Sequence, residues 1–183
     1  MKNIAIGGLI SAIATFMWGF VFWATPISQP SMKHTTSPQN TAIREALKDN
    51  LTETGTYFVP DQMHDMEGFM TQHREGPLAT IHFQKGGAEA MGAGVMLKGI
   101  LHMLLVWLFV GWLLALLPPL DTYAKRFRTV LLFGVASAVW STLGMPIWYF
   151  QPWAYWLMTC VYDLGAWAIA AAILAHFVKP EKV

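Results

Sequence analysis

The stretch GVMLKGILHMLLVWLFVGWLLALL, residues 94–117, decides the fold. Lys98 is its only Lys, Arg, Asp or Glu, and most of its other residues are large and apolar. A run of roughly 20 such residues is long enough to cross a lipid bilayer as a helix. Lipid offers no partner for unpaired backbone groups, so a single spanning segment must be helical. The stretch therefore predicts a membrane-spanning helix.

Three further runs of the same kind occur, at residues 4–24, 129–150 and 153–178. The first could be mistaken for a cleaved signal peptide. Its apolar stretch is longer than the usual 7–15 residues of such a peptide. It also ends in Phe22, Trp23 and Ala24, which is not the small-x-small pattern that signal peptidase prefers. We interpret it as a retained anchor, so the chain has four predicted spans.

The overall composition agrees with a chain that lies in lipid. Of 183 residues, 55% are apolar and 13% are charged, about half the charged fraction of an ordinary soluble domain. The formal net charge of +1 gives no electrostatic reason to expect a nucleic-acid partner. Cys160 is the only cysteine, so no internal disulfide can form.

The orientation in the membrane follows from the basic residues beside the spans. Those that lie near span ends or in short connections are Lys2, Lys125, Arg126, Arg128, Lys179 and Lys182. Loops rich in Lys and Arg stay on the cytoplasmic side. This predicts a protein of the bacterial inner membrane with both termini in the cytoplasm. The expected organisation is a first helix (1–24), a periplasmic cap (25–93), three more helices (94–178) and a cytoplasmic tail (179–183).

The cap is predicted to contain two helices and two strands. Turn and capping signals favour a helix from residue 40 or 41 to 50, a strand at 55–60, a helix at 61–74 and a strand at 78–83. A segment of this size is too small to be stable through its own core. The predicted fold is therefore an all-α membrane protein: a four-helix bundle with a small α+β periplasmic insertion between the first two helices.

Short motifs of the cap suggest a family. GTYFVP at residues 55–60 and EGPLATIHF at 75–83 are followed by a glycine-rich run that leads into the second span. This order resembles a group of small bacterial four-span membrane proteins to which no function is assigned. The resemblance implies the helix order and the cap, and it implies no activity and no site residues.

A stripe of small residues marks one face of the first span. It consists of Gly7, Ser11, Thr15 and Gly19. Residues four apart share a helix face, and small side chains let another helix approach closely. The stripe predicts helix packing, either within one chain or between two copies.

Five polar residues of the spans are candidates for an intramembrane site: Asp163, His102, Lys98, Ser137 and Ser141. Asp163 is the only acidic residue within a predicted span and falls near mid-bilayer. A carboxylate there is costly unless it faces the bundle interior, is neutral or is paired. Ser137 and Ser141 have the matching depth on the third span and could donate hydrogen bonds to it. Such a carboxylate predicts either a proton, ion or quinone site, or a hydrogen bond that fixes helix packing.

Lys98 and His102 lie one helical turn apart near the outer end of the second span. The long side chain of Lys98 can reach the membrane interface. His102 lies one turn deeper, where a pairing with Asp163 through water would allow protonation near neutral pH.

The segment DQMHDMEGFMTQH, residues 61–73, raises the possibility of a copper site. On a helical wheel, Met63, Met66, Met70 and His73 fall within about 80° of arc. Thioether sulfur favours Cu(I), and imidazole binds copper in either oxidation state. Phe69 lies beside the same arc and widens it to about 120°, which is typical of an ordinary apolar helix face. Both interpretations stay open at this point.

No familiar catalytic motif is present: the chain has no phosphate loop, GxSxG, CxxC or HExxH. The sequence favours a non-enzymatic accessory or assembly protein that acts with lipid and with other membrane subunits, or by self-association. Alternatives are a proton, ion or quinone-linked subunit that uses Asp163 and His102, and a periplasmic copper-binding protein.

Overall fold

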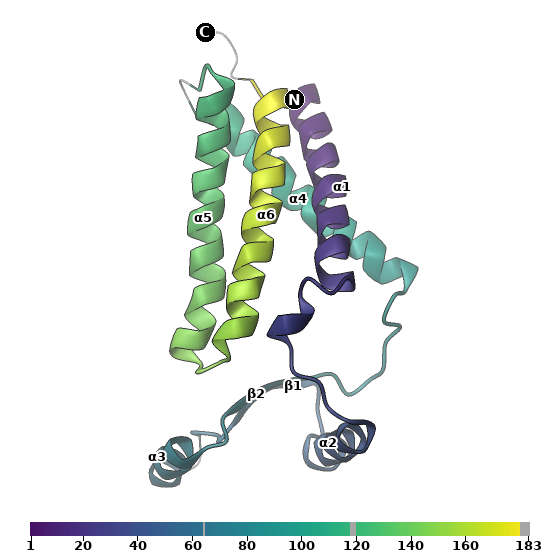
Figure 1. Cartoon of the computed structure of the whole chain (residues 1–183), viewed down its shortest axis with the longest axis vertical. Helices are drawn as coiled ribbons and strands as arrows, with labels where there is room; N and C mark the ends of the chain where they lie inside the picture. Colours follow the sequence, from purple (N-terminus) through teal and green to yellow (C-terminus); the bar gives the residue numbers. More distant parts are fainter. Residues whose placement is uncertain (64, 118–119, 180–183) are drawn as a thin grey trace. The chain divides into compact units, whose positions relative to one another are not determined.

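The computed structural model describes residues 1–63, 65–117 and 120–179. Four long helices stand out in these ranges: α1 (Lys2–Ala24), α4 (Ala93–Leu116), α5 (Tyr123–Trp148) and α6 (Trp153–Phe177) (Figure 1). Each is long and apolar enough to cross a membrane. The prediction of four helices with the length and composition of membrane spans is confirmed.

The third span was predicted from about residue 129, and the helix that contains it begins earlier. α5 begins at Tyr123, so the basic residues thought to form a loop belong to its first turns. The Thr122 hydroxyl accepts a hydrogen bond from the backbone N–H of Lys125 at 3.2 Å, which stabilises this earlier start. Lys and Arg are also good helix formers, so the basic residues within 125–128 did not show where α5 begins.

The chain divides into two compact units. We call Met1–Met32, Met91–Pro146 and Pro152–Val183 the helical unit, and Lys33–Ala90 with Ile147–Gln151 the mixed unit. The helical unit also contains a short 3-10 helix, η1 (Gln29–Ser31). The connection between α5 and α6 therefore belongs to the mixed unit, far in sequence from the rest of that unit.

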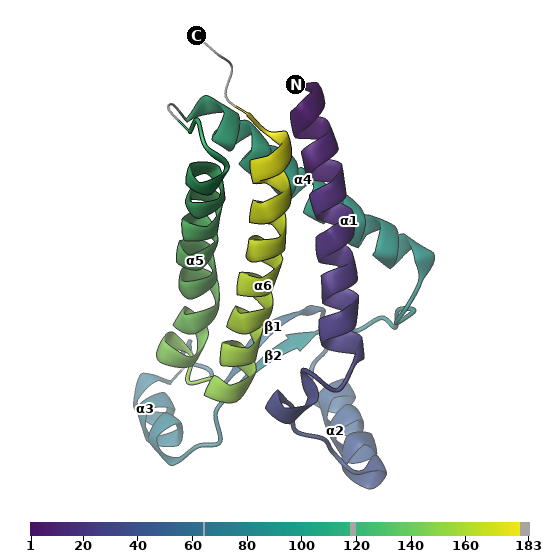
Figure 2. The ribbon, with the colours of Figure 1, turned by 45° about the horizontal axis from the view of Figure 1, so that its top comes forward.

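In the helical unit, α1 packs against both α4 and α6 (Figures 1 and 2). Its core is formed by Ala12, Trp107, Leu114, Val130, Ala170, Ala171, Leu174 and Val178. Glycines allow close approach: a Cβ on Gly7 would lie 3.1 Å from the Cβ of Phe177, and one on Gly111 would lie 3.2 Å from Ile4 Cγ2. The start of α1 and the ends of α4 and α6 therefore meet at one end of this unit.

One contact between α5 and α6 is made by a large side chain, Trp167. The Trp167 ring lies directly over Gly134, where a Cβ would overlap it. The same indole packs edge-on against Trp107, with ring centroids 5.0 Å apart and planes at 88°. Trp167 thus fills the space between three helices, and Gly134 leaves room for it.

The mixed unit contains α2 (Ser37–Asn50), β1 (Gly55–Val59), α3 (Met66–Glu75) and β2 (Ala79–Phe83). The strands pair antiparallel, with Gly55 opposite Phe83 and Tyr57 opposite Ile81. Both strands lie within one residue of the predicted ranges.

Both short helices begin elsewhere than predicted. α2 starts at Ser37, because the Gln39 side chain accepts a hydrogen bond from the Thr36 backbone N–H at 2.9 Å and caps the helix earlier. α3 starts at Met66 instead of Asp61, because the Asp65 carboxylate accepts from the Gly68 N–H at 2.9 Å. Residues 61–63 consequently lie outside the helix.

No residue that the structure describes in the mixed unit is fully buried. Several of its large apolar side chains are well exposed, among them Met63 (75%), Met66 (62%) and Phe58 (49%). The unit therefore lacks a core of its own.

Candidate functional site

A cavity of about 570 Å³ lies within the mixed unit. Its walls are β1 and the residues that follow it (56–63), Phe69 and His73 of α3, residues 78–80, and residues 148–150 between α5 and α6. This volume falls in the range of small-molecule binding sites. Four segments supply the walls, and residues 148–150 are distant in the sequence from the other three.

Aromatic rings form much of the lining. Phe58 stacks on Tyr149, with centroids 6.2 Å apart and planes at 18°. His73 lies between two rings, at 5.3 Å from Phe69 and 5.1 Å from Phe150. The ring pairs join the hairpin and α3 to the α5–α6 connection.

Phe150 has an unusual backbone conformation. Its φ is 54°, in the left-handed region that costs a residue with a side chain roughly 1–2 kcal/mol. Such outliers concentrate at functional sites, where the surrounding structure holds them in place. Here the conformation accompanies an edge-on contact of the Phe150 ring with His73, with planes at 76°.

The cavity has one acidic residue and no Lys or Arg among its lining residues. The acidic residue is Asp61, whose Oδ1 accepts a hydrogen bond from the Met63 backbone N–H at 3.1 Å. A carboxylate without a nearby cation disfavours anionic ligands and favours cationic ones.

The four predicted copper ligands do not gather at this cavity. Met63 and His73 line it, whereas Met66 and Met70 are absent from its lining and exposed at 62% and 52%. Met63 also precedes α3, so the helical wheel placed it wrongly. Among the described residues, no group of three or more His, Cys, Asp or Glu could hold a metal ion.

The copper hypothesis stays a prediction. It requires bound copper in protein purified with Cu(I), and a lower copper content after Met66→Ala with Met70→Ala.

The five polar residues of the spans are not brought together by any observed contact. Asp163 is half-buried on α6, and its carboxylate has no hydrogen bond or ion pair with the described part of the chain. Lys98 and His102 are exposed on α4. Ser137 and Ser141 lie on the exposed side of α5.

The residues of α5 that pack against the other helices were not identified from the sequence. Ala138 and Thr142 are its buried residues near Ser137 and Ser141. The Thr142 hydroxyl donates to the Ala138 carbonyl of its own helix. Ser137 and Ser141 were predicted as partners of Asp163 only because they lie at the same expected depth in the bilayer. The sequence does not indicate which side of α5 faces α6.

The stripe of small residues on α1 lies against its neighbours. Gly7, Ser11 and Thr15 are buried. A Cβ on Gly19 would lie 3.1 Å from the Tyr162 hydroxyl. The Thr15 hydroxyl accepts a hydrogen bond from Trp107 Nε1 at 2.8 Å and donates to the Ser11 carbonyl at 2.7 Å. These contacts connect α1 to both α4 and α6.

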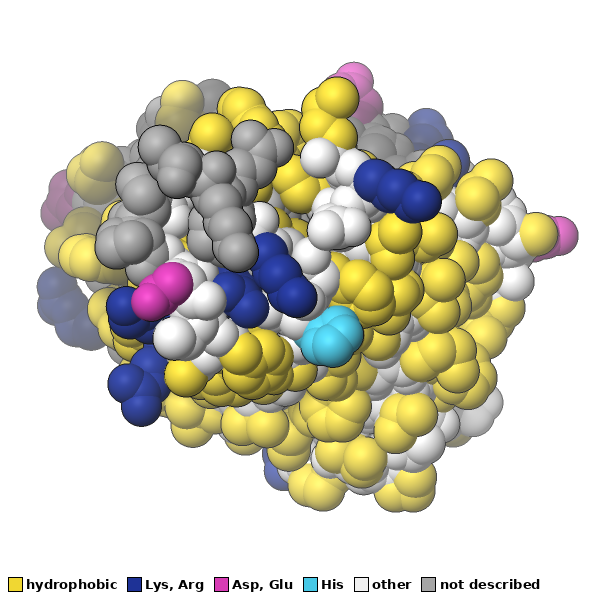
Figure 3. All heavy atoms as spheres, turned by 90° about the horizontal axis from the view of Figure 1, so that it is seen from above, with side chains coloured by type: hydrophobic (Ala, Val, Ile, Leu, Met, Phe, Trp, Pro, Cys, Tyr) yellow, Lys and Arg dark blue, Asp and Glu magenta, His cyan; other side chains and the backbone are white. Residues whose placement is uncertain are grey.

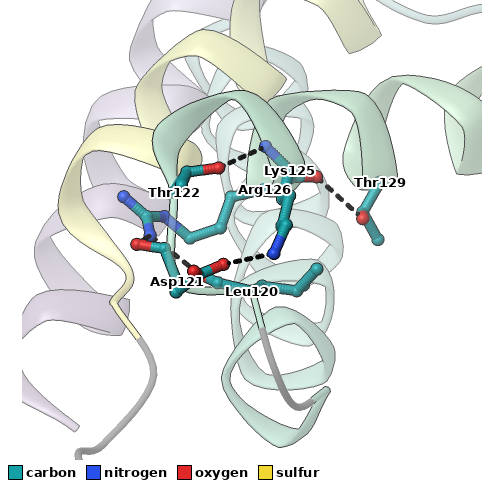
Figure 4. A network of polar contacts seen from close by, with 6 residues as sticks. All are labelled: Leu120, Asp121, Thr122, Lys125, Arg126 and Thr129. Carbon is teal, nitrogen blue, oxygen red and sulfur yellow. Dashed lines mark hydrogen bonds and ion pairs between the residues drawn. The ribbon is translucent and has the colours of Figure 1, made fainter.

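Arg126 has a structural role that the sequence did not reveal. Its side chain is 5% exposed. Nε donates to the Ala175 carbonyl at 2.8 Å, and Nη1 donates to the carbonyls of Leu120 at 2.9 Å and Asp121 at 3.2 Å. The guanidinium thus joins the last turn of α6 to the segment before α5, and Figure 4 shows it beside Leu120 and Asp121 of that segment. A cation is also favourable at a helix C-terminus, where the carbonyl dipoles point.

Lys125, next to Arg126, pairs instead with Asp121 at 2.7 Å on the surface (Figure 4). This hydrogen bond lowers the pKa of the Asp121 carboxyl below its ordinary value. The view onto this end of the molecule shows several Lys and Arg side chains and few acidic ones (Figure 3).

Comparison of the chain with protein-family models, with curated proteins and with solved structures found no match.

Proposed function

We propose that this protein is a four-span protein of the bacterial inner membrane, with a small α+β insertion in the periplasm and both termini in the cytoplasm. The four long apolar helices support the membrane location. The orientation is supported by basic residues at one end of the helical unit, where Arg126 binds the Ala175 carbonyl. Lys and Arg near span ends favour the cytoplasmic side.

We further propose that it acts without catalysis, as an accessory or assembly protein that binds a membrane-protein partner through the mixed unit. One observation carries this proposal: no described residue of the unit is fully buried, although the unit is rich in large apolar side chains. Apolar surface of this kind marks binding sites, because leaving it in water is unfavourable. A partner subunit would supply the missing cover.

Site-specific photo-crosslinking in intact membranes tests this proposal. A photoreactive phenylalanine analogue at Phe58 or Met70 is expected to capture one protein of defined mass. The same analogue at Leu132, 68% exposed on α5, is the control and is expected to give none of that product. Replacing residues 35–90 with a flexible linker should abolish association in mild detergent, whereas Asp163→Asn should preserve it. Association that survives the replacement contradicts the proposal.

A second candidate is a proton, ion or quinone-linked function at Asp163. It is favoured by the half-buried side chain of Asp163, which lies within a proposed span. The carboxylate has no hydrogen-bond partner in the described part of the chain. Acidic residues in such positions commonly mark ion or proton pathways. Proton movement into proteoliposomes, followed with a pH-sensitive dye, tests it. Unchanged movement in Asp163→Asn and His102→Ala contradicts this function.

A further inference from the structure

We infer that the cavity of the mixed unit binds an organic cation that carries apolar groups, of the quaternary ammonium type. This site shares Phe58 with the partner surface proposed above, but its ligand is a small molecule and not a protein. Its test uses purified protein alone, so its outcome does not depend on whether a partner is found.

The size and lining of the cavity favour a small apolar molecule. About 570 Å³ accommodates a ligand of ordinary small-molecule size. Phe58, Phe69, Trp148, Tyr149 and Phe150 all line it. The backbone of Phe150 is in the left-handed region, and its ring forms part of this wall instead of closing into a core.

The charge of the lining selects the sign of the ligand. Asp61 is its one acidic residue, and no Lys or Arg lines the cavity. Aromatic faces carry negative electrostatic potential and attract cations within about 6 Å of the ring centre. The carboxylate and the aromatic faces both favour a cation, and the His73 ring, which also lines the cavity, packs against Phe69 and Phe150.

The kind of cation follows from the hydrogen-bond groups. Asp61 is the one carboxylate of the lining and its Oδ1 also accepts the Met63 N–H, so aromatic faces outnumber the charged acceptors that a strongly hydrated ammonium needs. A quaternary ammonium has no N–H to satisfy and is the type of cation that aromatic cages recognise. Two sources share this chemistry: a free small molecule, and the choline group of a lipid.

The experiment is calorimetric titration of the full-length protein in a maltoside detergent, which contains no choline. Benzyltrimethylammonium is the probe, and benzyl alcohol and benzenesulfonate are its neutral and anionic counterparts. We expect binding of the cation at least about tenfold tighter than binding of either counterpart. Equal binding of the three compounds, or no binding of the cation, overturns the inference.

Two variants place the binding in the cavity. Trp148 is 76% exposed and has little part in folding, so Trp148→Leu removes an aromatic face at small structural cost. We expect Trp148→Leu and Asp61→Asn each to weaken binding of the cation by roughly three- to tenfold. Asp49→Asn, an exposed acid of α2 that does not line the cavity, is the matched control and should change nothing. Affinity unchanged in both cavity variants overturns the inference.

Competition separates the two sources of the ligand. Displacement of the probe by a short-chain phosphocholine detergent identifies a lipid choline group as an acceptable ligand. Failure of that detergent to compete, with the probe still bound, restricts the site to free cations, and both outcomes support the inference.

Discussion

At the scale of single residues, Arg126 shows how a basic side chain can stabilise a membrane protein from inside. Its guanidinium is buried and binds three backbone carbonyls from two segments. A planar guanidinium has five N–H donors, so one side chain can serve several acceptors. The adjacent Lys125 and the nearby exposed Arg128 have no such set of contacts.

Arg126→Gln is therefore expected to destabilise the protein by about 3 kcal/mol, because hydrogen bonds to charged groups contribute roughly 1.5–3 kcal/mol and the buried carbonyls lose their donor. Arg128→Gln is the matched control, since Arg128 lies two residues further along α5 and is exposed. Thermal unfolding in detergent measures both. Equal melting temperatures for the two variants would refute a structural role for Arg126.

The Thr15–Trp107 hydrogen bond leads to a second prediction at this scale. Thr15→Val keeps the shape of the side chain but leaves the Trp107 N–H without its acceptor. Side-chain hydrogen bonds between membrane helices contribute about 0.6 kcal/mol on average and at most about 1.7. We expect a loss of stability in this range, measured by unfolding in mixed micelles. Thr159→Val, whose hydroxyl bonds only the Tyr155 carbonyl of its own helix, should have a smaller effect.

At the scale of elements, the packing of α5 on α6 depends on the space above Gly134. A Cβ there would overlap Trp167, whose ring also packs on Trp107. Moving Trp167 therefore disturbs α4 as well as α5.

Gly134→Ala should cost about 1–3 kcal/mol, the usual cost of overpacking a well-filled core. Gly94→Ala is the control, because nothing lies within 4 Å of a Cβ at that position of α4. The free energy of unfolding of both variants is obtained from the ratio of folded to unfolded protein during denaturation in detergent. A tolerated Gly134→Ala would mean that α5 can separate from α6 without loss of stability.

The two termini and the mixed unit are predicted to face opposite sides of the membrane, which is a property of the whole molecule. Because Cys160 is the only cysteine and is buried, a Cys160→Ser background allows single reporter cysteines. In intact cells, a membrane-impermeant maleimide should label Lys48→Cys of α2 and should label Lys179→Cys only after permeabilisation. We expect this labelling pattern because Lys and Arg residues gather at the ends of the spans that lie near the two termini, and such ends stay on the cytoplasmic side. The reverse labelling pattern would mean an inverted protein.

By itself, the sequence determined the four long apolar helices and the order of the elements between the first two of them. Apolar runs of sufficient length require helices in lipid, and a strand pattern bounded by proline and glycine is readable locally. The small-residue face of α1 was also visible, because helical periodicity depends on neighbours three and four residues away.

Only the tertiary structure decided which side of each helix is packed and where the cavity lies. Ser137 and Ser141 are exposed while Thr142 is buried, because the rotation of α5 is set by the contact of Gly134 with Trp167. Arg126 is buried because the end of α6 passes beside it. The cavity joins residues 56–63 to 148–150. Such contacts depend on how distant segments meet, and local periodicity contains no information about them.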